Sequence, residues 1–79
     1  MKTSNLWKHE IGAGFEKWVG GGHEVVLVKL SERHNGTWRA TCDGKAISDM
    51  PFPNKGSAVT GIRRVLLRLE REMALKQVA

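Results

Sequence analysis

The feature that most constrains the fold is one change of pattern, which falls between residues 51 and 56. Two prolines and a glycine interrupt this short stretch, whereas residues 57 to 76 contain no proline and a single glycine. Apolar residues then recur at helical spacing, at Ala58, Ile62, Val65, Leu66, Leu69 and Met73. This spacing places them on one stripe of a helix. The sequence therefore predicts a helix over residues 57 to 76, with Asn54 or Ser57 as its N-cap.

Ahead of this helix the chain has short β-type runs separated by turn residues. Residues 24 to 31 are rich in valine and leucine, which is typical of a buried strand. Turns at residues 34 to 36 and 43 to 44 contain asparagine, aspartate and glycine, which suit hairpins. The runs at 37 to 42 and 45 to 49 are then a second and a third strand. Together they predict an antiparallel meander.

Side-chain alternation predicts which residues of the meander face the helix. A three-residue first hairpin loop sets Leu30 opposite Ala40 and Val28 opposite Cys42, and the second hairpin sets Ile47 opposite Ala40. We expect these apolar residues to pack beneath the helix. The opposite face of the sheet then carries cations and hydroxyls, from Lys29, Ser31, Arg33, Thr37, Arg39, Thr41 and Ser48.

The first 22 residues have a weaker pattern. Aromatic residues recur there at helical spacing, but Gly12 and Gly14 would each cost a helix about 1 kcal/mol relative to alanine. We therefore expect an extended segment, with residues 15 to 19 as an added strand. The fold class expected is α+β, a three- or four-stranded antiparallel meander packed against one long C-terminal helix. The single domain divides into an N-terminal segment, a meander, a linker and a helix, at residues 1–22, 23–50, 51–56 and 57–76.

Composition excludes several classes of protein. A chain of 79 residues builds one small core, and its surface-to-volume ratio leaves association of two copies open. Its single cysteine, Cys42, excludes an internal disulfide and a thiolate-rich zinc site. No apolar run approaches the ~20 residues that cross a bilayer, and the first residues do not resemble a signal peptide. We expect a cytoplasmic protein with no membrane partner.

Catalytic and metal-binding patterns are missing from the sequence. The three histidines lack the spacing of a zinc site. Cys42 with His34 could form a nucleophile pair, but the predicted register favours a core role for the cysteine. No glycine-rich phosphate loop follows a strand. We therefore expect no enzyme activity, no metal and no cofactor.

Charge gives the strongest indication of a partner. The chain has 13 Lys and Arg against 8 Asp and Glu, a net charge of +5. Residues 51 to 79 contribute about +4 of this and residues 1 to 50 about +1. A basic balance of this kind favours a polyanionic partner, because lysine and arginine displace counterions from phosphates. The alternative is that the charge serves solubility alone.

Two predicted surfaces could carry nucleic-acid binding. A narrow β-ribbon can enter a B-form major groove, where arginine pairs with guanine and lysine meets phosphate. The residues expected to do this on the sheet are Lys29, Arg33, Arg39 and Thr41. On the helix, the residues expected to add phosphate contacts are Arg63, Arg64 and Arg68. An ordinary solvated face is the alternative for both surfaces.

From residue 36 to residue 70 the chain resembles a known family of DNA-binding domains. The matching residues are Gly36, Trp38, Arg39, Ala40, Gly44, Lys45, Phe52, Lys55 and Ala58. They resemble the three-stranded domains with a closing helix at the N-termini of phage-type tyrosine recombinases, and more distantly those of plant ethylene-response factors. In that family the sheet contacts DNA, which implies this role for Arg33, Arg39 and Thr41.

Two functional hypotheses follow. The first is a small non-enzymatic module that binds nucleic acid, with DNA favoured over RNA. The second is a compact phage-type interaction or inhibitor protein, such as an anti-CRISPR protein, that acts on a host nucleic-acid-processing complex. Its interface would include Trp7, Leu67 and Leu75, which the sequence places in an N-terminal aromatic segment and on the outward side of the helix.

Overall fold

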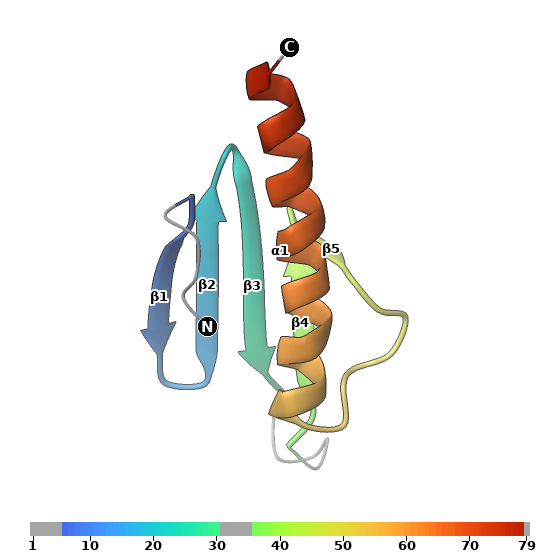
Figure 1. The fold of residues 1–79 in the computed structure, drawn as a ribbon. Coiled ribbons are helices and arrows are strands. Elements are labelled where there is room, and N and C mark those ends of the chain that lie inside the picture. Colours follow the sequence, from blue (N-terminus) through green and yellow to red (C-terminus); the bar gives the residue numbers. More distant parts are fainter. Residues whose placement is uncertain (1–5, 31–35, 79) are drawn as a thin grey trace.

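The computed structural model describes residues 6–30 and 36–78, which form a five-stranded antiparallel sheet and one long helix (Figure 1). The elements in chain order are β1 (Lys8–Gly12), β2 (Phe15–Gly20), β3 (His23–Lys29), β4 (Trp38–Cys42), β5 (Lys45–Ala46) and α1 (Lys55–Val78). The strands lie in sequence order across the sheet. The α+β class is confirmed, but the sheet has five strands rather than three or four.

The N-terminal segment forms a hairpin that the sequence predicted only in part. β2 matches the strand expected over residues 15 to 19. β1 was not expected, because its sequence holds a single aliphatic residue, Ile11, among charged residues and glycine. All five residues of β1 pair with β2, and this pairing supplies the backbone hydrogen bonds that compensate for the weak local preference.

The register predicted for the first hairpin, between β3 and β4, is wrong. Leu27 pairs with Ala40 and Val25 pairs with Cys42, so the pairing is shifted by three residues from the expected one. Because three is an odd number, every β3 side chain lies on the other face from the one predicted. β3 ends at Lys29 and β4 begins at Trp38, so the connection is longer than the predicted three residues. Most of the turn predicted at residues 34 to 36 lies outside the described residues.

The register predicted for the second hairpin, between β4 and β5, is confirmed. Cys42 pairs with Lys45 across a two-residue turn, and the Ile47 amide donates to the Ala40 carbonyl at 3.0 Å. Asp43 begins this turn with a φ of 52°. Its carboxylate accepts hydrogen bonds from the Glu24 amide at 2.8 Å and contacts His23 Nδ1 at 2.8 Å. The His23 ring and then the Glu24 amide lower the pKa of Asp43.

The shifted register changes the composition of the sheet's two faces. We call the face beneath α1 the helix face and the opposite one the outer face. Lys29 pairs with Trp38 and so lies on the helix face, at the end of β3, which corrects its predicted place. Val28 pairs with Arg39 on the outer face and is 41% exposed, instead of packing in the core. Leu30 lies beyond the end of β3 and does not face Ala40.

The core lies between α1 and the helix face. α1 packs over β3 and β4 (Figure 1), and the largest fully buried side chains are Leu27, Ile62 and Val25. The predicted helix is confirmed, with slightly wider bounds. Asn54 is its N-cap, since its Oδ1 accepts the Ser57 amide at 2.8 Å. The apolar stripe is therefore buried, and the opposite side of α1 faces away from the sheet.

Candidate nucleic-acid interface

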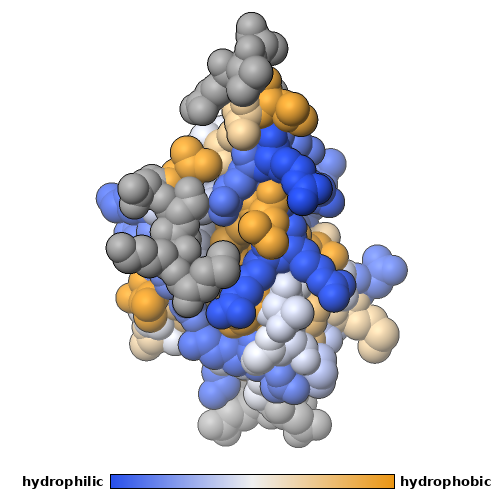
Figure 2. All heavy atoms as spheres, viewed as in Figure 1, coloured by the Kyte–Doolittle hydropathy of each residue, from blue (hydrophilic) through white to orange (hydrophobic). Residues whose placement is uncertain are grey.

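The outward side of α1 presents three arginines. Arg64, Arg68 and Arg71 are exposed and, at 100° per residue, lie opposite the buried stripe. We call these three residues the arginine face. Figure 2 shows strongly hydrophilic residues along α1, with hydrophobic residues between them. From the first to the last arginine the helix rises by roughly 10 Å.

These guanidinium groups have no acidic partner among residues 6–30 and 36–78. The ion pairs there join other residues: Lys17 with Glu10 and Glu24, Lys55 and His9 with Glu16, and His23 with Asp43. Glu70 of the same helix instead accepts the Trp7 indole N–H at 2.8 Å. No ion pair within the described residues therefore neutralises the arginine face.

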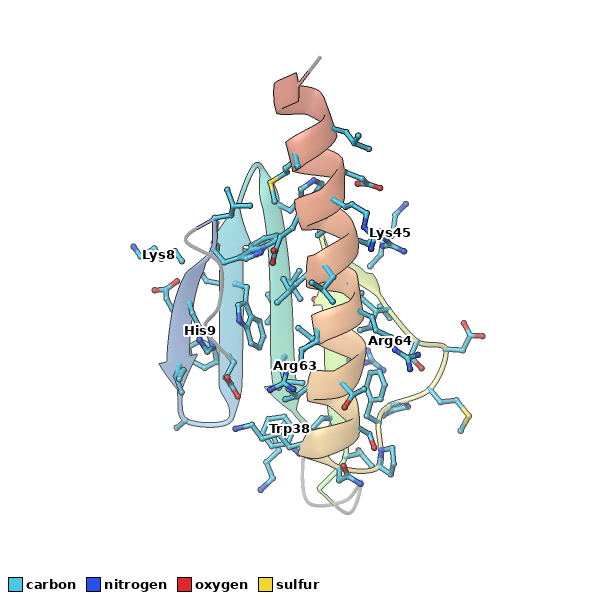
Figure 3. All side chains as sticks on the ribbon, viewed as in Figure 1. Lys8, His9, Trp38, Lys45, Arg63 and Arg64 are labelled. Atoms are coloured by element: carbon cyan, nitrogen blue, oxygen red, sulfur yellow. The ribbon has the colours of Figure 1, made fainter. Side chains whose placement is uncertain are left out.

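Arg63 and Lys45 flank the arginine face on different sides. Figure 3 places Arg63 and Arg64 on opposite sides of α1, with Lys45 on the same side as Arg64. Lys45 is exposed and pairs with Cys42 across the β4–β5 turn. The charge of Arg68 acts to lower the pKa of the Cys42 thiol, so Arg68 lies near this turn. The basic surface therefore extends from α1 to β5. Of the three helix arginines that the sequence predicted, Arg64 and Arg68 lie together and Arg63 does not join them.

Cys42 does not have the environment of a reactive nucleophile. Burial, followed by the Asp43 carboxylate, raises the pKa of its thiol, and the opposing effect of Arg68 is smaller. Its side chain packs at the edge of the core. The protonated thiol is the weakly nucleophilic form. The predicted pairing partner, His34, lies outside the described residues.

Two exposed leucines lie among the arginines. Leu67 is 54% exposed and Leu75 is 68% exposed. Single exposed leucines are common on proteins, but these two share the outward side of α1 with the arginine face. Trp7, the third residue predicted at a partner interface, has only 6% of its surface exposed and packs in the core. Its ring therefore does not form part of a contact surface.

The outer face of the sheet is less basic than the sequence suggested. Arg39 is exposed there, with Thr41 on the same face. Lys17 lies between the carboxylates of Glu10, at 3.5 Å, and Glu24, at 3.8 Å, which neutralise it. Lys29 lies on the other face, and Arg33 is outside the described residues. Phe15 and Val28 are also exposed on the outer face, so part of that surface is apolar.

The arginine face and Arg39 lie on opposite sides of the sheet. Arg39 occupies the face turned away from α1, whereas the arginine face is on the side of α1 turned away from the sheet. One straight duplex cannot contact both surfaces of so small a domain. The two predicted halves of the nucleic-acid site are therefore two separate surfaces.

A buried polar cluster around Glu16 was not predicted from the sequence. Glu16 is buried on the helix face, where its carboxylate contacts Lys55 Nζ at 2.9 Å and His9 Nε2 at 3.0 Å. The His9 ring stacks on Trp18 with centroids 4.6 Å apart. Glu16 and Trp18 are two residues apart on one strand, so alternation within β2 could have indicated this placement. The cluster joins the first hairpin to the start of α1.

A hollow in the described part of the chain is small for a ligand site. A shallow pocket of about 140 Å³ lies beside Arg39 and is lined by Asp49, Met50 and Phe52 among others. Ligand pockets are typically about 300 Å³ or more. Within the described ranges, no three metal-ligating side chains gather in one place. None of the helical structure there has the length and hydropathy to cross a membrane.

The chain matches none of the family models, curated proteins or solved structures with which it was compared. The resemblance to recombinase domains therefore stays a prediction from the residues that carry it.

Proposed function

We propose that this protein binds nucleic acid without catalysis, and that the arginine face of α1 is its main contact surface. The observation that carries the proposal is the absence of carboxylate partners for Arg64, Arg68 and Arg71 within the described chain, although all three are exposed. Unpaired guanidinium groups are available for phosphates, which they bind with paired N–H donors.

The dimensions of the arginine face suit a phosphate backbone. Its length of roughly 10 Å corresponds to about three nucleotides of one strand, at about 3.4 Å each. The arginine face lies on the side of α1 turned away from the sheet, so the described strands do not obstruct its approach to a groove (Figure 1). A B-form major groove admits a helix, whereas the major groove of an RNA duplex is too narrow. We therefore favour duplex DNA as the ligand.

A matched pair of arginine variants tests the proposal. Arg68→Ala and Arg39→Ala each remove one exposed charge, from opposite sides of the sheet. We expect Arg68→Ala to weaken binding of a labelled duplex by roughly three- to tenfold, because a phosphate contact is lost. Arg39→Ala should leave the Kd within about twofold of the wild type. Fluorescence anisotropy at low salt measures both values, and circular dichroism checks that each variant is folded.

The reverse result would contradict this placement. If Arg39→Ala abolishes binding and Arg68→Ala does not, the outer face is the binding surface, as the sequence and the family resemblance suggested. If the wild type binds neither duplex DNA, single-stranded DNA nor RNA at low salt, the nucleic-acid proposal is wrong.

A protein partner is the second candidate function. Leu67 and Leu75 favour it, because exposed leucines beside arginines suit a protein surface better than a phosphate backbone. An inhibitor of a nucleic-acid-processing complex would use this side of α1 in the same way. A nuclease-treated lysate tests this: a stoichiometric partner should be recovered with the wild type and lost with Leu67→Asp. Retention of the partner by that variant would exclude this surface.

A further inference from the structure

The two edges of the sheet differ. β5 forms one edge and has only two residues, whereas β1 forms the other edge and has five. Within the described residues, no strand pairs with the outer side of β1. Proteins commonly protect such an edge by shortness, charged side chains, proline or a bulge. β5 is short. β1 contains no proline and pairs with β2 without interruption, and its charged residues Lys8 and Glu10 have opposite signs, so they can attract a second copy instead of repelling it.

The backbone of β1 has free hydrogen-bonding groups at defined positions. Gly12 pairs with Phe15 across a two-residue turn, and this closing pair is hydrogen bonded. Bonding then alternates along the strand, so Glu10 and Lys8 also bond to β2. The amides and carbonyls of His9 and Ile11 therefore point away from the sheet. Ile11 is also 71% exposed, so the edge has apolar surface as well as unpaired backbone groups.

We propose that β1 pairs with β1 of a second copy of this chain, antiparallel and centred on His9. The outward-facing backbone groups of the two His9 residues then hydrogen bond to each other. The backbone of Ile11 lies opposite that of Trp7 in the second copy. Lys8 lies opposite Glu10 of the second copy, and this ion pair occurs twice by symmetry. The two sheets become one continuous sheet of ten strands.

The charge pattern selects this register over its neighbour. A pairing centred on Glu10 would also use the backbone groups of His9 and Ile11, but it sets two Glu10 carboxylates opposite each other. Like charges directly opposite destabilise a strand pair. The His9 rings do not obstruct the favoured register, because each ring is held within its own copy by Glu16 and Trp18.

The proposed interface is separate from the arginine face. α1 packs on β3 and β4 with the arginine face on its side turned away from the sheet, whereas the proposed interface uses the edge strand β1. Dimerisation can therefore fail while nucleic-acid binding persists, and nucleic-acid binding can fail while the dimer persists.

Charge reversal tests both the interface and its register. Lys8→Glu and Glu10→Lys each replace the two attractive pairs by two repulsive ones, and we expect each to weaken the dimer by roughly tenfold or more. An equimolar mixture of the two variants should form a heterodimer of about wild-type affinity, because every facing pair is then opposite in charge. Sedimentation velocity over about 1 µM to 1 mM measures the wild type, both single variants and their mixture.

Lys8→Glu is the primary variant, because Lys8 makes no ion pair within the described residues. Glu10→Lys also removes the contact with Lys17, so thermal unfolding checks that it remains folded. Hydrogen exchange gives a second readout: the amides of His9 and Ile11 should become protected as concentration rises, while the Glu10 amide is protected throughout. A wild type that stays monomeric, single variants that dimerise like the wild type, or a mixture that does not dimerise would each overturn the proposal.

Discussion

Glu16 is a charged residue that the fold buries, and its surroundings explain why the cost is acceptable. Burial acts to raise the pKa of its carboxyl, but hydrogen bonds from Lys55 and then His9 outweigh that effect and lower the pKa below 4.5. Lys55 also lies over the Trp38 ring at 5.5 Å. Glu16 therefore holds the first turn of α1 against the sheet as an ionised group.

This arrangement predicts a pH-dependent loss of stability for Glu16→Gln. A folded pKa below the unfolded value stabilises the fold above about pH 4.5, and this contribution is lost as pH falls through the folded pKa. We expect the variant to unfold more easily by about 1 kcal/mol at pH 7. The difference from the wild type should shrink steadily as pH falls below about 4.5.

Urea unfolding at pH 7 and pH 3 measures this effect. Glu24→Gln is the control, because that carboxylate is exposed and contacts Lys17 only at 3.8 Å. Its stability should change little at either pH. A Glu16→Gln variant as stable as the wild type at pH 7 would show that the buried carboxylate contributes nothing.

At the scale of elements, the β2–β3 turn shows how a loop is adapted to the helix above it. Gly21 and Gly22 have φ values of 57° and 82°, a region that favours glycine. A Cβ at Gly21 would collide with the Met73 side chain of α1, whereas a Cβ at Gly22 would meet nothing within 4 Å. Only one of the two glycines is therefore also required by packing.

The two alanine variants should differ accordingly. Gly22→Ala should destabilise the protein by about 1 kcal/mol, from backbone strain alone. Gly21→Ala should cost about 1 kcal/mol more, since Met73 has to move, although its flexible side chain limits the penalty. Thermal unfolding of the pair measures the difference. Equal melting temperatures would show that the hairpin does not press against α1.

The elements also show which parts of the fold can be predicted from sequence. The helix was predictable, because six apolar residues at helical spacing and an N-cap agree with each other. The Asp43 turn was predictable from local chemistry. The β3–β4 register was not, because the residues at 34–36 look like a tight turn while pairing of Val25 with Trp18 of β2 determines which side of β3 is buried. β1 depends entirely on its neighbour.

The candidate site was predictable only in part, for the same reason. Periodicity along α1 places Arg64 and Arg68 correctly, since a helix face depends on local spacing alone. Lys29 was misplaced because its face depends on the long-range register of β3. The burial of Trp7 against Glu70 involves residues 63 positions apart, which no local pattern reports.

At the scale of the whole molecule, the fold places three candidate contact surfaces apart from one another, and the sequence alone did not separate them. The arginine face lies on α1, the less basic outer face lies across the sheet, and the β1 edge lies away from both. A net charge of +5 is then less informative than its location. If two copies associate through β1, one particle carries two arginine faces, which increases its avidity for a long polyanion.

The central claim is that the arginine face binds phosphates, and the salt dependence of binding tests it most directly. Each phosphate contact contributes about 0.9 to the slope of log K against log salt concentration. We expect the triple variant Arg64→Ala, Arg68→Ala, Arg71→Ala to bind duplex DNA with a slope smaller by roughly 2 to 3 than that of the wild type. An unchanged slope in the folded variant would contradict the account.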